Sequence, residues 1–124
     1  MAVTTTTPAY PRTGEAPLDL AYLSRFTLGN HELEQEVLEL FSAQAPLYLE
    51  RLAAAECPKS WGQAAHTLKG SALAVGANEV GRLALAAEQE GFAAEPERRR
   101  RRVPELEAAV DRVVTFIAEV LAAR

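Results

Sequence analysis

The sequence predicts an all-α protein, an antiparallel up-down four-helix bundle with a short extra N-terminal helix. The chain has 124 residues, a length that suits one domain. Apolar residues make up 48% of it and aromatic residues only 6%, so Ala, Leu and Val must fill most of the core. Runs of β-branched residues, the usual signal for strands, are missing apart from residues 4–7.

The chain divides into an arm and a domain. Residues 1–17 contain a threonine run, three prolines and few apolar side chains, so we expect a disordered N-terminal arm. Residues 18–124 are expected to form the helical bundle. Its first element is a short helix over about 19–26, capped by Asp19, whose spacing places three apolar residues on one face: Leu20, Leu23 and Phe26.

A long second helix is predicted over about 31–55. Gly29 stops the preceding helix and Asn30 is a good N-cap for the next. A broad stripe with a period of about 3.6 residues is expected to face the core. Pro46 lies inside the helix and should kink it. The stripe consists of Leu33, Val37, Leu40, Phe41, Ala45, Tyr48 and Leu52.

Three more helices follow. Pro58 favours the start of a helix over 58–75, which Gly76 ends. The next covers about 78–91, with Val80, Leu83 and Ala87 facing inward. The last is expected over about 96–123, where Pro104 either makes a second kink or marks the true start of the helix. Its stripe consists of Val103, Leu106, Val110, Val113, Ile117 and Val120.

Composition also excludes several classes of protein. One cysteine, Cys57, cannot form an internal disulfide, and with two histidines it cannot complete a four-ligand zinc site. No apolar run approaches about 18 residues, and the N-terminus has no signal-peptide pattern. The formal net charge of −4 disfavours nucleic-acid binding. We therefore expect a cytoplasmic helical module that binds partners or transfers a group.

The helix over 58–75 carries the most informative pattern. On a helical wheel its core residues fall within roughly 40° of one line, and His66 lies about 140° away, on the solvent side. The core residues are Trp61, Ala65, Leu68, Ala72 and Val75. The residues that share the sector of His66 are Lys59, Gly62, Gln63, Lys69, Gly70 and Leu73.

This sector is unusual for a plain helix surface. Each of its two glycines costs about 1 kcal/mol relative to Ala, and together they open the space one turn before and one turn after His66. An imidazole nitrogen is a competent nucleophile near neutral pH. Lys69 could neutralise an anionic adduct, for which phosphoryl is the obvious candidate, and Gln63 could donate a hydrogen bond. The alternative is an ordinary surface histidine beside a surface lysine.

The residues from His66 onward resemble the signature of the histidine-containing phosphotransfer (HPt) domain family. The run H-T-L-K-G-S-A at 66–72 matches H-x-L-K-G-S-[SA], and Gly76-Ala77 and Glu88 follow at the family's positions. Upstream segments at 18–23, 26–30, 40–46 and 61–66 also resemble bacterial members. Two positions depart from the family, which often has Ser at Ala72 and usually has Leu at Ala87. The resemblance covers about 18–123 and implies a free-standing bacterial HPt protein.

The resemblance implies a function. His66 would be phosphorylated on Nε2 by a receiver-domain aspartate and would pass the group to another receiver in a two-component multistep phosphorelay. The partners would be receiver domains of response regulators, a hybrid sensor histidine kinase, or both. The receiver would supply Mg²⁺, while this chain would bind no cofactor or metal, have no kinase activity and remain a monomer without nucleic-acid or membrane partners.

The resemblance and the wheel together give roles to single residues. Lys69 would stabilise the phosphoryl oxygens, Gly70 would give clearance and Gln63 would donate a hydrogen bond. A further set is expected to dock the partner, namely Lys59, Gly62, Ser71 and Leu73.

Two other functions stay open. The same bundle could bind receiver or kinase domains without accepting phosphate. A hydrolase with His66 as base is disfavoured, because the face of His66 shows neither the carboxylate nor the nucleophile that it would need.

The remaining chemistry-bearing residues receive structural interpretations. His31 is expected to be solvated or to cap a helix, Cys57 to be an incidental thiol, and Glu88 to be an exposed or interhelical acid. Five consecutive arginines at 98–102 are expected to be solvated, with contact to an acidic partner or to nucleic acid as lesser alternatives. The acids expected to balance them are Glu95, Glu97, Glu105 and Glu107.

Overall fold

The computed structural model describes residues 16–93 and 95–124. This part of the chain holds five helices and no strand, which confirms the all-α prediction. The helices are α1 (Leu20–Phe26), α2 (His31–Ala53), α3 (Pro58–Val75), α4 (Asn78–Glu90) and α5 (Pro96–Ala122). Their ends agree closely with the predicted ones, although α2 ends at Ala53 instead of Ala55. Most of the predicted arm, residues 1–15, lies outside the described residues.

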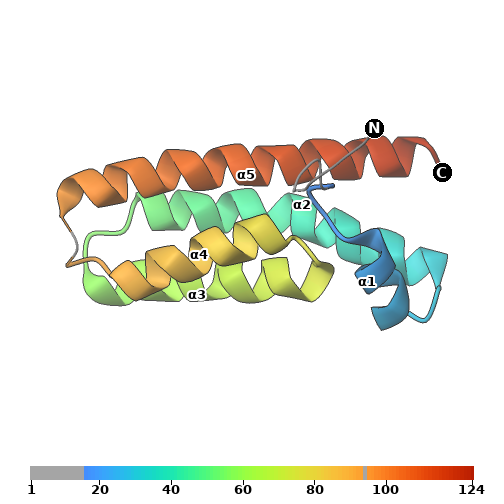
Figure 1. Cartoon of the computed structure of the whole chain (residues 1–124), viewed down its shortest axis with the longest axis horizontal. Coiled ribbons are helices and arrows are strands. Elements are labelled where there is room, and N and C mark those ends of the chain that lie inside the picture. Colours follow the sequence, from blue (N-terminus) through green and yellow to red (C-terminus); the bar gives the residue numbers. More distant parts are fainter. Residues whose placement is uncertain (1–15, 94) are drawn as a thin grey trace, which may run out of the picture.

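The four long helices lie side by side along the long axis of the molecule, and α1 lies at one end (Figure 1). α3 packs against α2 and α4, and α5 packs against the same two helices, while α1 contacts α3. The helices therefore form a closed ring in which α3 and α5 occupy opposite corners. This placement leaves the outer face of α3 directed away from α5.

Caps at the helix ends follow the sequence signals. Asp19 accepts a hydrogen bond from the backbone N–H of Tyr22, and Asn30 accepts one from Leu33, each at 3.0 Å. Gly76 ends α3 with a left-handed φ of 82°. A Cβ on Gly76 would lie 3.0 Å from the carbonyl oxygen of Asp19, so both the backbone angle and the space require glycine here. This turn therefore packs the end of α3 against the start of α1.

The five predicted core residues of α3 are all buried, which confirms the prediction for this helix. The prediction for α2 was partly wrong: Leu33 and Leu40 are 42% and 56% exposed, whereas Leu38 and Leu49 are buried. Apolar residues occur on more than one side of α2, and only its packing between α3 and α5 selects the buried line. Phe26 is also exposed, at 64%, because the short α1 buries only Leu23 fully.

Both prolines inside helices are accommodated without a break. α2 continues through Pro46 and α5 continues through Pro104. The alternative in which Pro104 starts the last helix is therefore wrong, since α5 begins at Pro96. The predicted kinks at both prolines stay predictions.

The arginine run is not uniformly solvated, which corrects the prediction for it. Arg102 pairs with Glu90 at 2.7 Å and with Glu105 at 3.0 Å, and this pairing lowers the pKa of Glu90. The guanidinium of Arg99 lies 4.2 Å from the centroid of the Phe92 ring. These two arginines fall on the inner side of α5, so they join its first turns to the end of α4. Glu105 was among the predicted partners and is confirmed as one, whereas Glu90 was not predicted.

Two further polar contacts tie the helices together. The indole N–H of Trp61 donates to the carbonyl oxygen of Ala87 at 2.8 Å, joining α3 to α4 inside the core. At the other end of the molecule the buried Glu34 pairs with Arg124 and accepts from the hydroxyl of Thr27. Across residues 16–93 and 95–124, none of the helices combines the length and apolar content needed to cross a membrane.

Candidate phosphoacceptor site

His66 lies in the middle of α3 on its outer face, and its side chain is 67% exposed. Its Nδ1 atom lies 2.9 Å from Oε2 of Glu88, which comes from α4. The other carboxylate oxygen, Oε1, accepts a hydrogen bond of 2.9 Å from Nζ of Lys69. One carboxylate therefore connects the exposed imidazole and the neighbouring ammonium group.

The Glu88 contact determines which imidazole nitrogen can react. An ionised carboxylate can only accept hydrogen bonds, so Nδ1 of His66 must carry the proton in this contact. In the neutral ring the lone pair then lies on Nε2. Nδ1 is occupied by Glu88, and Nε2 is the nitrogen left to act as a nucleophile. A partner bonded to one ring nitrogen in this way selects the tautomer and restricts rotation of the ring.

The contacts of Glu88 favour its ionised form. Its pKa is held below the usual value, chiefly by the hydrogen bond from Lys69 and further by the one from His66. The Glu88 side chain is 28% exposed and that of Lys69 is 22% exposed, so water screens this pair only partly. The site thus has a carboxylate that can stabilise a positive charge developing on the imidazole.

This arrangement corrects two expectations. Glu88 was expected to be an exposed or interhelical acid without a direct part in the site; the interhelical contact is confirmed, but its partners are His66 and Lys69. The face of His66 was expected to lack a carboxylate, and Glu88 supplies one. The helical wheel also treats Lys69 as a free cation, whereas the ammonium group of Lys69 is already paired with Glu88. His66 and Glu88 are 22 residues apart and lie on different helices, so helical periodicity does not predict that they meet. Only the packing of α3 against α4 reveals the contact.

The two glycines beside His66 face open space. A Cβ added at Gly62 or at Gly70 would meet nothing within 4 Å. The fold itself therefore does not require glycine at either position, although glycine lowers helix stability. The space is available to an approaching group, as the sequence predicts.

Three of the other predicted residues share the outer face of α3 with His66, whereas Ser71 lies about 140° from it around the helix. Lys59 and Gln63 are exposed, Ser71 is half-buried, and Leu73 is 46% exposed. Leu73 leans against α4 at Gly81, where an added Cβ would lie 2.6 Å from Cδ2 of Leu73. Gly81 thus lets an apolar side chain lie over α4 while remaining accessible.

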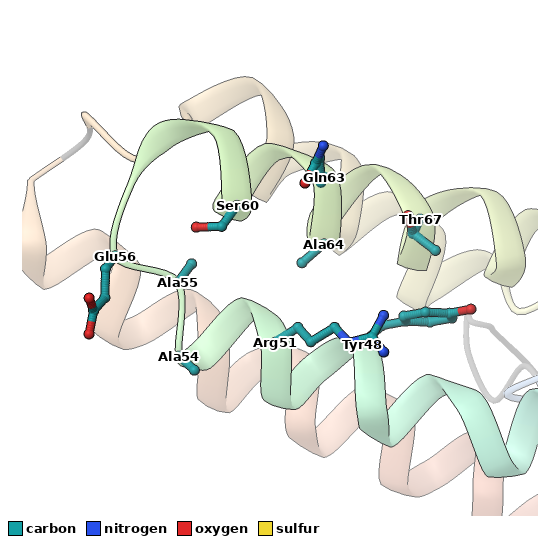
Figure 2. A pocket seen from close by; sticks show the side chains of 9 residues that line it. All are labelled: Tyr48, Arg51, Ala54, Ala55, Glu56, Ser60, Gln63, Ala64 and Thr67. Carbon is teal, nitrogen blue, oxygen red and sulfur yellow. The ribbon is translucent and has the colours of Figure 1, made fainter.

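Gln63 borders an open pocket of about 690 Å³ between α2 and α3 (Figure 2). Ser60 and Thr67 contribute to its α3 wall, and Tyr48 and Arg51 to its α2 wall. The Arg51 guanidinium lies 5.6 Å from the centroid of the Tyr48 ring. Because Gln63 and Thr67 are close neighbours of His66 on α3, this pocket flanks the histidine on the side opposite Glu88.

The remaining candidates do not join the site. His31 is exposed at the start of α2, as expected. Cys57 is exposed before α3, and hydrogen bonding with Ser60 lowers the pKa of its thiol. Among the described residues, no group of three or more His, Cys, Asp or Glu side chains could hold a metal ion.

The family model described as the Hpt domain matches residues 36–122, well over half of the chain. The chain therefore belongs to the Hpt domain family, whose members are phosphocarrier modules that perform histidine phosphotransfer in phosphorelays and interact with receiver domains. No curated protein and no solved structure matches the chain.

Proposed function

We propose that this protein accepts a phosphoryl group on Nε2 of His66 from an aspartate of a receiver domain and passes it to the aspartate of another receiver. The observation that carries the proposal is the hydrogen bond between Nδ1 of His66 and Glu88, which leaves Nε2 on an exposed, uncrowded helix face. A phosphorelay carrier needs an accessible nucleophile and compensating charge more than it needs a complete catalytic apparatus.

The transfer balances without an additional reactant. The lone pair on Nε2 attacks phosphorus, the P–N bond forms, and the P–O bond of the aspartyl phosphate breaks, releasing the aspartate carboxylate. No proton has to leave the imidazole, because Nδ1 keeps its proton and the ring becomes positively charged. Glu88 accepts from that proton and stabilises the positive charge. The reverse sequence returns the group to a receiver.

Lys69 and Gly70 support the adduct. Lys69 lies one helical turn from His66 and donates to Glu88, so its ammonium group is held near the imidazole before transfer. Once a dianionic phosphoryl group is attached to Nε2, it competes with Glu88 for this donor. Gly70 provides clearance for the group, and Gln63 provides an amide donor on the pocket side. The receiver supplies Mg²⁺, and this chain holds no cofactor or metal of its own.

The proposal extends to architecture and docking. The four long helices form an antiparallel up-down bundle, and α1 is the short extra helix at its end. The contacts of each long helix with two others support this arrangement. Docking uses Lys59, Gly62, Ser71 and Leu73, and the partner is a response-regulator receiver or a hybrid sensor histidine kinase. The protein acts as a cytoplasmic monomer of a bacterial two-component system and has no kinase activity.

Transfer of label from a phosphorylated receiver tests the proposal. With ³²P-labelled receivers as donors, we expect the protein to acquire an acid-labile, alkali-stable label, the pattern of a phosphohistidine. The variant His66→Gln should acquire none, because it lacks the nucleophile, whereas His31→Gln should be labelled like the parent. Circular dichroism should show equal helicity in all three proteins.

Two results would contradict the proposal. Label that persists in His66→Gln would place the acceptor elsewhere. A protein that binds several receivers but never becomes labelled would be a non-phosphorylated interaction module, the alternative function.

A further inference from the structure

The start of α5 presents a second charged surface at a distance from His66. Arg98, Arg100 and Arg101 are exposed and make no ion pair with any described residue. Glu90 and Glu105 both pair with Arg102, whereas Glu95, the N-cap residue, and Glu97, in the first turn of the helix, are exposed. Those two acids complement the positive end of α5. The three outward arginines are called the arginine surface below.

An apolar pocket of about 330 Å³ adjoins the arginine surface. Its walls come from three different helices and from the segment after α4. Arg99 and Arg100 are the charged residues among those that line it. This volume is at the lower end of typical ligand pockets, so it suits one or two apolar side chains. The larger apolar residues of the lining are Leu52, Trp61, Phe92, Pro96, Val103 and Pro104.

The geometry of the arginines favours an extended ligand over a small anion. Successive residues of a helix point about 100° apart, so Arg100 and Arg101 project in different directions, while Arg98 and Arg101 lie one turn apart. The three arginines are therefore spread over more than one side of the helix. They can contact successive carboxylates of a chain that crosses the start of α5.

We propose that the arginine surface and the adjoining pocket bind an acidic peptide segment of a partner protein, with an apolar side chain of that segment in the pocket. Carboxylates complement the unpaired arginines, and the pocket next to Arg100 accounts for the apolar anchor. The overall charge of −4 repels polyanions from the rest of the molecule, so binding is confined to this end.

The position of this surface separates it from phosphotransfer. The side chain of His66 is exposed on α3. α5 lies at the opposite corner of the ring of helices from α3 (Figure 1). A receiver on His66 and an acidic segment on α5 can therefore bind together. Binding at α5 would raise the local concentration of this protein near its partner without occupying the phosphoacceptor face.

Fluorescence anisotropy tests the inference with a short fluorescein-labelled peptide made of Asp and Glu around a central Leu-Phe pair. We expect binding that weakens as salt rises. The triple variant Arg98→Gln, Arg100→Gln, Arg101→Gln should bind at least about tenfold more weakly. The matched control Arg25→Gln, Arg82→Gln, Arg112→Gln loses the same charge elsewhere and should bind like the parent. A peptide with Ser-Ser in place of Leu-Phe should also bind about tenfold more weakly.

Several outcomes would overturn the inference. Equal weakening by the two triple variants would show attraction by net charge alone, and equal binding of the Ser-Ser peptide would show that the pocket plays no part. Tighter binding of duplex DNA or of phosphatidylserine vesicles, lost in the first triple variant, would assign the surface to nucleic acid or membrane. Inhibition of His66 labelling by saturating peptide would show that the two surfaces overlap. Failure of labelling itself would leave the peptide measurements unaffected.

Discussion

The two faces of α3 both contain small residues, but the surroundings of these residues differ. On the inner face small and large apolar side chains alternate, and Ala65, Leu68 and Ala72 are completely buried. On the outer face the small residues Gly62 and Gly70 border empty space, with an exposed histidine between them. Small residues inside allow helices to approach, whereas small residues outside leave room for a partner. The comparison predicts that inner changes alter stability and outer changes alter transfer.

The largest expected effect on stability comes from truncating a leucine of α3, and its size should depend on the face that carries the leucine. Leu68→Ala should lower the free energy of unfolding by about 2–5 kcal/mol, because it leaves a cavity in the core. Leu73→Ala makes the identical change on the outer face and should cost under about 1 kcal/mol. Urea unfolding followed by circular dichroism measures both. Equal losses would show that the outer leucine is part of the core.

Glu88 tests whether the outer face also depends on α4. Glu88→Gln keeps the size of the side chain and removes its charge, so it should slow labelling of His66 by about tenfold, the difference between a charged and a neutral hydrogen bond. Single-turnover labelling from a phosphorylated receiver measures the rate. The matched control Glu90→Gln removes the same charge two residues further along α4, where Glu90 pairs with Arg102, and should leave the rate unchanged. A slow Glu90→Gln variant with a normal Glu88→Gln variant would reverse the assignment.

Gly70→Ala should separate stability from transfer. Nothing obstructs the added Cβ, so the helix should gain about 1 kcal/mol of stability. Labelling should become slower, because the methyl group occupies the clearance beside His66. The opposite behaviour is expected of Gly76→Ala, which places a side chain at a left-handed φ of 82° and should destabilise the protein. A Gly70→Ala protein that is more stable and equally active would remove clearance from the proposed role of this glycine.

The smallest expected effect is on how the stability of the protein depends on pH. Folding lowers the pKa of Glu88, so its stabilising contribution is complete above its ordinary pKa and is lost as pH falls through the lowered value. The melting temperatures of the parent and Glu88→Gln should therefore differ at neutral pH and converge in acid. In a Lys69→Ala background the neutral difference should shrink, because the hydrogen bond from Lys69 is the main cause of the lowering. A difference that grows in acid would contradict the sign.

Local signals account for what could be predicted. Caps, prolines and glycines determined where the helices begin and end, because these signals act over a few residues. The period of the apolar residues determined the buried line of α3 and the exposure of His66, since α3 has one continuous apolar stripe. In α2 the same reasoning placed Leu33 and Leu40 inside, because apolar residues on several sides leave more than one possible line.

The sequence by itself therefore determined the helical class, the helix ends and the single exposed histidine between two glycines. Only the tertiary structure decided which acid contacts that histidine, which side of α2 is buried, and which arginines of α5 remain outside. The physical reason is distance along the chain. Caps and periodicity depend on neighbours within one or two helical turns, whereas the contacts of Glu88 with His66 and of Glu90 with Arg102 depend on how two helices pack.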